Sequence, residues 1–194
     1  MKNILTILII FAFTYNSSQA GCSPQNIIPL RTYTEIPQDQ CYYMKDTNNE
    51  LQDYTGTWMG TWNNKTFYVT FKKLTNKYDD HFKYNKDLLI GKFKTLSSNG
   101  NILFDNTAIM DNDAKITGGK FIKDENNYSL GYFDKDLCNN RGFITIAFTN
   151  STKTQLAWRY MPKRTVIYPD CYFYNYSASQ YPDPLPKNII LTKQ

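Results

Sequence analysis

The sequence predicts an all-β protein, an antiparallel meander of about eight to ten strands that forms a barrel or a strongly curved sheet. Three observations lead to this expectation. Aromatic residues make up 16% of the chain, which favours strands because rings pack well on a pleated surface. Apolar and polar residues alternate over several short segments, which turn residues separate. After the N-terminus, no segment sustains a helical period.

The alternation is clearest near the middle of the chain. Phe67, Val69 and Phe71 are apolar at every second position, so we expect them to face the interior from the first strand. A further strand is expected over residues 88–96. An Asn-Gly pair follows at residues 99–100, and this pair is typical of a hairpin because both positions tolerate positive φ.

Later segments continue the meander. Residues 115–122 carry a central Gly-Gly pair and are expected to form a hairpin by themselves. Residues 128–133 form the next expected strand, and residues 142–148 and 155–161 form a second hairpin. A short strand is expected at residues 189–191, close to the C-terminus.

The N-terminus has the pattern of a secretory signal peptide. A single Lys precedes about a dozen mostly apolar residues, too few for a lasting transmembrane anchor, and small residues lead to a cleavage point after Ala20. We therefore expect residues 1–20 to be removed and the protein to be exported, either to the periplasm or out of the cell.

The mature chain is expected to form one domain, because about 170 residues suit a single core and no boundary is visible. Residues 21–55 are rich in Pro and polar residues and are expected to form an N-terminal arm. Residues 56–194 are expected to form the barrel-like domain, which includes an irregular C-terminal arm rich in Pro and Tyr.

The chain has four cysteines, Cys22, Cys41, Cys138 and Cys171. An even number suits two disulfides in an oxidising compartment, and four cysteines allow three connectivities. As an alternative, Cys22 carries a lipid anchor, because small residues precede it, but lipidation would leave one other cysteine without a partner. A metal site is not expected, because the cysteines are far apart in the sequence.

The sequence lacks the residue patterns that are typical of common catalytic and metal sites. His81 is the only His, and no Gly-Xaa-Ser-Xaa-Gly segment is present. Asp111-Asn112-Asp113 begins like a calcium loop, but Ile116 stands where such a loop needs Gly. The formal net charge of +5 is spread along the chain, which argues against a nucleic-acid-binding face. We therefore expect no enzyme activity, no cofactor or metal, and no nucleic-acid partner.

The heptapeptide GTWMGTW, residues 56–62, repeats Gly-Thr-Trp directly before the expected first strand. A Gly-Xaa-Trp at this place resembles the opening of lipocalins and related calycin barrels. The resemblance implies that Gly permits a tight chain entry and that Trp seals one end of the barrel beneath an Arg of the last strand. The residues that would play these parts are Gly56, Trp58, Gly60, Trp62 and Arg159.

The layout of the whole chain resembles a family of small exported proteins of unknown function from Bacteroidota. The resemblance rests on the signal segment, on MKDTNNELQDYTGTW at residues 44–58 and on DPLPKNIILTKQ at residues 183–194. It implies export and a single domain, and it implies no activity.

Two functions remain open. The barrel could carry a small apolar ligand in a cavity lined by Phe67, Val69, Phe71, Ile144 and Ile146. Alternatively, the core is solid, and the protein acts as a protein–protein interaction or inhibitor module through the Tyr residues of its C-terminal arm. A cavity of about several hundred Å3 behind the inward residues would favour the carrier.

Overall fold

The structure is a computed structural model of the 194-residue chain, and it describes residues 26–37, 40–163, 167–177 and 180–194. The expected signal segment, residues 1–20, lies outside the described residues. One sheet contains 11 strands: β1 (Asn26–Pro29), β2 (Tyr42–Lys45), β3 (Gly56–Trp62), β4 (Lys65–Asp79), β5 (Tyr84–Leu96), β6 (Ile102–Asp105), β7 (Ile116–Phe121), β8 (Tyr128–Asp134), β9 (Asn140–Phe148), β10 (Gln155–Lys163) and β11 (Asn188–Lys193). A short helix, α1 (Glu50–Tyr54), precedes β3, and a 3-10 turn, η1 (Asp111–Asp113), precedes β7.

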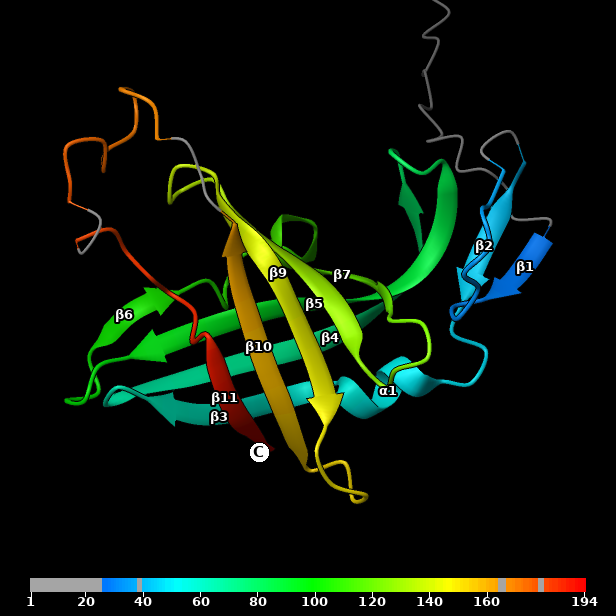
Figure 1. The fold of residues 1–194 in the computed structure, drawn as a ribbon, viewed down its shortest axis with the longest axis horizontal. Coiled ribbons are helices and arrows are strands. Elements are labelled where there is room, and N and C mark those ends of the chain that lie inside the picture. Colours follow the sequence, from blue (N-terminus) through cyan, green and yellow to red (C-terminus); the bar gives the residue numbers. More distant parts are fainter. Residues whose placement is uncertain (1–25, 38–39, 164–166, 178–179) are drawn as a thin grey trace, which may run out of the picture.

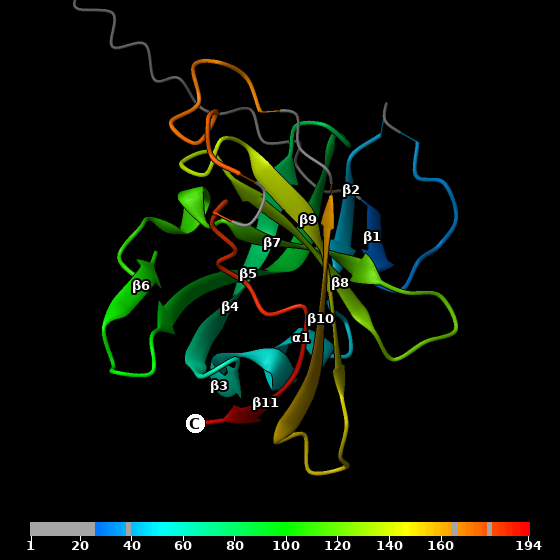
Figure 2. The same cartoon turned by 60° about the vertical axis from the view of Figure 1, so that its left-hand side comes forward.

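Eight of the strands close into an antiparallel barrel (Figure 1, Figure 2). From β3 to β11, each barrel strand pairs with the next barrel strand in the chain, with β6 left out of the ring. The last strand, β11, pairs with β3 and closes the ring. This up-and-down order confirms the expected all-β antiparallel meander.

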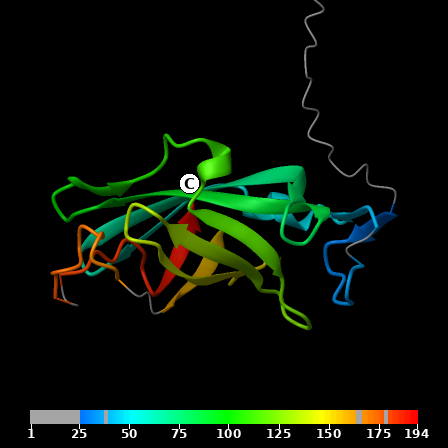
Figure 3. The ribbon, with the colours of Figure 1, turned by 90° about the horizontal axis from the view of Figure 1, so that it is seen from above.

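The strand β5 has three partners along the edge that β4 leaves free. β2 pairs with it at residues 85–86, β7 at residues 90–91 and β6 at residues 94–96. The strands β1 and β2 belong to the expected N-terminal arm, and they extend the sheet beyond the barrel as a parallel pair. Figure 3 shows β1 and β2 on the opposite side of the molecule from residues 167–177.

The hairpin expected at the Gly-Gly pair is wrong, because these residues form one strand, β7. A Cβ on Gly118 would lie 2.9 Å from the backbone N and O of Leu89 and 2.3 Å from the Tyr128 hydroxyl. Gly118 is therefore needed so that β7 can lie close to Leu89 of β5 and to the side chain of Tyr128 of β8, and not for a turn. A turn is confirmed at residues 99–100, and it has positive φ, +80°, at Gly100 but not at Asn99.

Large side chains fill the barrel interior. The largest fully buried ones are Trp58, Trp158, Tyr128, Tyr132, Phe67, Phe71, Phe93 and Phe121. Rings from different strands meet edge to face: the centroid of Phe67 lies 5.2 Å from that of Trp158, and Tyr132 lies 5.7 Å from Tyr160. Such pairs are favourable beyond their buried area, because the edge of one ring faces the electron-rich face of the other.

The helix α1 covers one end of the barrel. Asp46 fixes its first turn by accepting a hydrogen bond from the backbone N–H of Glu50 at 2.8 Å. The indole N–H of Trp58 donates to the carbonyl oxygen of Tyr54 at 2.8 Å, which ties α1 to β3. The ring of Tyr54 stacks on Phe148 with centroids 4.4 Å apart. This end is therefore closed by packed rings.

A short strap, residues 182–187, covers the other end of the barrel. Its central residue, Leu185, is fully buried. The Thr95 hydroxyl and the Trp158 indole N–H donate to the strap carbonyls that flank Leu185, at 3.1 Å and 2.8 Å. These bonds satisfy two buried donors and hold the strap against β5 and β10. The barrel is thus closed at both ends.

Candidate functional site

The Gly-Thr-Trp repeat forms the first barrel strand, β3, instead of preceding it. Gly56 has a φ of +107°, which a residue with a side chain rarely adopts. A Cβ on Gly60 would lie 2.3 Å from Ile189 Cδ1 and 2.8 Å from the carbonyl oxygen of Ile190. Gly60 therefore lets β11 approach β3 where the barrel closes.

The two Trp residues of the repeat differ in burial. Trp58 is fully buried beneath α1, and Trp62 is half-buried against the core. The cation over the Trp58 ring is Lys193 of β11, with Nζ 5.3 Å from the ring centroid. Arg159, expected in that place, is exposed on the outer face of β10. Because Trp158 faces inward, the next residue along the strand must face outward.

The five residues expected to line a ligand cavity lie in the filled core. Phe67, Val69, Phe71, Ile144 and Ile146 are each at most 2% exposed and belong to one cluster of buried apolar side chains. The cavities described below are lined by other residues. The ligand-lining role of these five residues stays a prediction.

One of the expected disulfides joins Cys138 to Cys171, whose Cα atoms are 5.6 Å apart. Cys41 is also disulfide-bonded. Cys22, and with it the lipid-anchor alternative, lies outside the described residues. A disulfide is consistent with an exported location, because reducing compartments keep thiols free.

Residues 167–177, which we call the aromatic arm, are fastened by this disulfide to the turn between β8 and β9 (Figure 1). A second attachment is provided by Tyr181, whose hydroxyl donates to the carbonyl oxygen of Leu137 and whose ring lies 5.6 Å from that of Phe173. Four side chains of the arm are nevertheless 41–77% exposed: Tyr168, Tyr172, Tyr174 and Tyr176. The arm is held on the barrel while its Tyr rings face solvent.

Large apolar side chains also lie on the outside of neighbouring barrel strands. Phe133 on β8, Phe143 on β9 and Met161 on β10 are 44%, 57% and 42% exposed. Phe143 and Met161 are direct cross-strand partners, and Phe133 is paired with Arg141, two residues before Phe143. We call the outward-facing positions of β8, β9 and β10 the outer wall.

The outer wall is a surface that was not expected from the sequence. The feature of the sequence that indicates the wall is the presence of two successive apolar residues within a strand, as in Tyr132-Phe133 and Phe143-Ile144. Successive residues of a strand point to opposite faces, so such pairs place an apolar side chain on each face. A strand with one solvated face would alternate instead.

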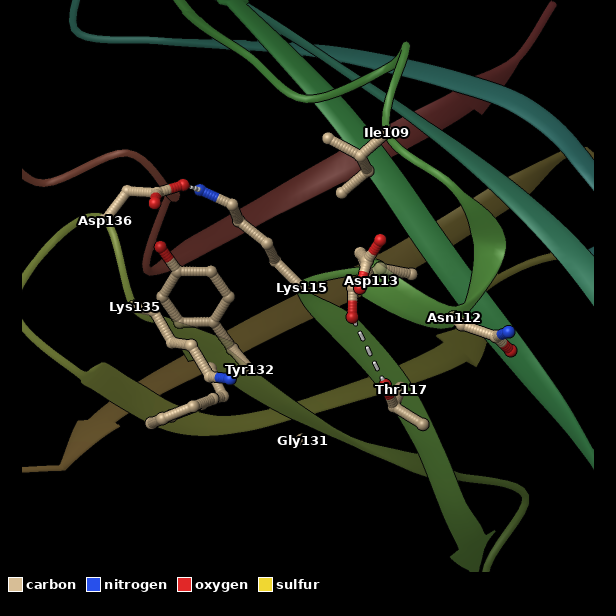
Figure 4. A pocket seen from close by; sticks show the side chains of 11 residues that line it. Ile109, Asn112, Asp113, Lys115, Thr117, Gly131, Tyr132, Lys135 and Asp136 are labelled. Carbon is tan, nitrogen blue, oxygen red and sulfur yellow. Dashed lines mark hydrogen bonds and ion pairs between the residues drawn. The ribbon is translucent and has the colours of Figure 1, made fainter. Parts of the chain in front are cut away.

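A cleft of about 610 Å3 opens on the outside of the barrel beside the outer wall (Figure 4). The segment before β7, with Ile109 and Asp113, forms one side, and Lys135 and Asp136 after β8 form the other. Phe133 lines the cleft and also belongs to the outer wall. The two surfaces are therefore continuous.

Fixed charges border this cleft. The Lys115 ammonium donates to the carboxylates of Asp134 and Asp136, each at 2.7 Å. Burial lowers the pKa of Lys115, but the hydrogen bonds to both carboxylates outweigh burial and leave this pKa above its ordinary value. Burial, aided by the Asp134 carboxylate, likewise raises the pKa of Tyr132. Both groups keep their protons at neutral pH, and both already donate to carboxylates of the protein, Lys115 to Asp134 and Asp136 and Tyr132 to Asp134. They therefore hold the border of the cleft in place and are not suited to proton transfer.

A smaller cavity of about 340 Å3 lies beside α1. Its charged side chains are already paired: Arg31 with Glu50 at 2.9 Å, and Lys153 with Asp53. Arg31 also lies 4.0 Å above the centroid of the Phe121 ring. This cavity is smaller than the cleft and is lined by no residue of the outer wall, so it is the weaker candidate for a binding site.

The described ranges contain no group of three or more His, Cys, Asp or Glu side chains suited to hold a metal ion. Among the helices of the same ranges, none has the length and apolar character needed to cross a membrane. His81 lies in the turn between β4 and β5, where its ring meets Phe82 with centroids 4.9 Å apart.

Comparison with known proteins identifies a family whose function is unknown. The model of a family of unknown function, DUF6705, matches residues 1–194. No curated protein and no solved structure matches the chain. The expected membership in a family of unknown function is confirmed, and the association with Bacteroidota stays a prediction.

Proposed function

Because the chain belongs to the DUF6705 family, whose function is unknown, we propose its function from its own residues. It is an exported binding protein that recognises a partner protein through the outside of its barrel and catalyses no reaction. The recognition surface comprises the aromatic arm and the outer wall.

The observation that carries this proposal is the contrast between interior and exterior. The interior is filled by rings and closed at both ends, by α1 and by the strap. Seven of the fourteen large exposed hydrophobic side chains of the described residues lie on the arm or on three adjacent strands. Clusters of exposed apolar side chains mark interaction sites on many proteins.

The aromatic arm suits recognition because it is ordered before any partner binds. A Tyr side chain buries a large area and has few rotatable bonds, so its immobilisation costs little entropy. The Cys138–Cys171 disulfide and the bond from Tyr181 to Leu137 restrict the arm in advance. Restricting a binding segment in this way increases affinity by lowering the entropy lost on association.

Carriage of a small apolar ligand is the other candidate, and the barrel topology is compatible with it. A ligand in the interior would have to displace rings such as Phe67 and Trp158, which are in contact, and lift Leu185 out of its buried position. We therefore assign recognition to the outside of the barrel.

Site-specific photocrosslinking of the full exported chain tests this proposal. We expect benzoylphenylalanine in place of Tyr172, which is 77% exposed on the arm, to form covalent protein adducts in cells that make the protein naturally. The matched control is Ile27 on β1, 58% exposed on the opposite side of the molecule (Figure 3), where we expect no adduct. Equal adduct yields at both positions, or none at position 172, would contradict the proposal.

A further inference from the structure

The outer wall carries positive charge and no acidic residue. Its outward-facing positions are alternate residues of 129–133, 141–147 and 155–163, and none of them is Asp or Glu. Arg141 and Arg159 are exposed there, and neither forms an ion pair with any residue in the described part of the chain. The wall therefore presents two guanidinium groups that are available to a partner.

These cations border an apolar centre. Arg141 lies opposite Phe133 in the register of β8 and β9, and Arg159 is two residues from Met161 on the same face of β10. Phe143 lies opposite Met161, between the two cations. The cores of protein interfaces are enriched in aromatic residues, Met and Arg, and are depleted in Asp and Glu. The apolar centre of the wall and the two Arg residues that border it have the composition of an interface core.

The charges of the wall argue against a second copy of the same chain as the binding partner. In a two-fold dimer each wall would face an identical wall, because such an interface is built from the same patch on both subunits. Arg141 and Arg159 would then face a wall that carries the same two cations and no carboxylate to pair with them. Like charges brought together in this way cost free energy, so the wall fits a different molecule.

The shape of the surface favours a protein over a lipid membrane. The wall continues through Phe133 into the cleft of about 610 Å3, which is bordered by Lys135 and by the carboxylates of Asp113 and Asp136. A chain segment can enter such a concave site and pair with charges of both signs. A flat lipid headgroup layer would leave the cleft unfilled.

We infer that the outer wall is the docking face for an acidic segment of the partner protein. Carboxylates of this segment pair with Arg141 and Arg159, since the planar guanidinium group matches a carboxylate through two hydrogen bonds. An apolar side chain between these carboxylates packs on Phe143 and Met161. The inference rests on the proposed function and specifies the chemistry of the partner.

The test uses benzoylphenylalanine in place of Phe143 in the full exported chain, so that no ligand has to be assumed. We expect a protein adduct whose crosslinked peptide, identified by mass spectrometry, is rich in Asp and Glu. Reversal of both charges, Arg141→Glu with Arg159→Glu, lowers the adduct yield by about tenfold or more. A matched reversal at two exposed cations elsewhere, Lys45→Glu with Lys123→Glu, leaves the yield unchanged.

The outcomes separate this inference from the proposed function. A Phe143 adduct that survives the Arg reversals, or one formed with lipid, overturns the acidic partner, while adducts from Tyr172 still support recognition by the arm. Absence of adducts from both Tyr172 and Phe143 overturns the inference and the proposed function together. Thermal unfolding of each variant shows whether a lost adduct reflects lost folding, and both Arg side chains are exposed, so the fold is expected to persist.

Discussion

Closure of this barrel depends on a glycine, Gly60, at which there is no space for a Cβ atom. Gly60 stands in β3 at the point where Ile189 and Ile190 of β11 pass it, and only a glycine leaves space for the Ile190 carbonyl oxygen. The strands β3 and β11 are far apart in the sequence, and their ladder has only two residue pairs. A short ladder tolerates little displacement of its backbone.

We expect Gly60→Ala to lower the free energy of unfolding by about 1–3 kcal/mol, because the new Cβ overpacks a backbone atom that cannot rotate away. The matched control is Gly131→Ala, where the nearest atom to the new Cβ is the Thr117 carbonyl oxygen at 3.9 Å. We expect that control to change the free energy by less than about 0.5 kcal/mol. Urea unfolding measures both, and equal losses would show that Gly60 has no special part in closure.

At the scale of strands, the sequence predicted most directly the strand in which apolar and polar residues alternate. Alternation identified β4 through Phe67, Val69 and Phe71, because only one of its faces is buried. The same rule should have excluded Arg159 as the partner of the barrel Trp, since it lies between the inward residues Trp158 and Tyr160. The position of Arg159 in the chain suggested the pairing, but the alternation of inward and outward residues along the strand places its side chain outside the barrel.

Other elements depend on neighbours that the sequence does not reveal. Gly118 suggested a turn, but its missing side chain serves contact with Leu89 and Tyr128 on other strands. The apolar centre of the outer wall forms only because Phe143 and Met161 come into register, and the cleft forms only because the segment before β7 folds beside β8. The aromatic arm was the part of the site that composition alone indicated.

The strap that covers one barrel end makes a prediction at the scale of elements. We expect Leu185→Ala to lower the free energy of unfolding by about 2–5 kcal/mol, because a fully buried side chain leaves a cavity at the sealed end. The control Ile190→Ala removes a side chain that is 52% exposed, and we expect a loss below about 1 kcal/mol. Denaturant unfolding compares the two variants. A Leu185→Ala variant as stable as the control would show that the strap does not seal the barrel.

The whole molecule has two dissimilar sides. One side carries β1 and β2, which extend the sheet beyond the barrel, and the other carries the aromatic arm (Figure 3). The arm is fastened by Cys138–Cys171 to the turn that follows β8, and β8 also contributes Phe133 to the outer wall. Recognition from the side of the arm would leave the N-terminal strands free of the partner.

The central claim is that the interior is a filled core and that recognition takes place outside it. Native and denaturing mass spectrometry of the exported, disulfide-bonded protein test this claim most directly. We predict that both spectra give the mass of the bare chain, with no small molecule retained under native conditions. An additional mass of an apolar compound, retained in the native spectrum and released on denaturation, would contradict the claim and identify the barrel as a carrier.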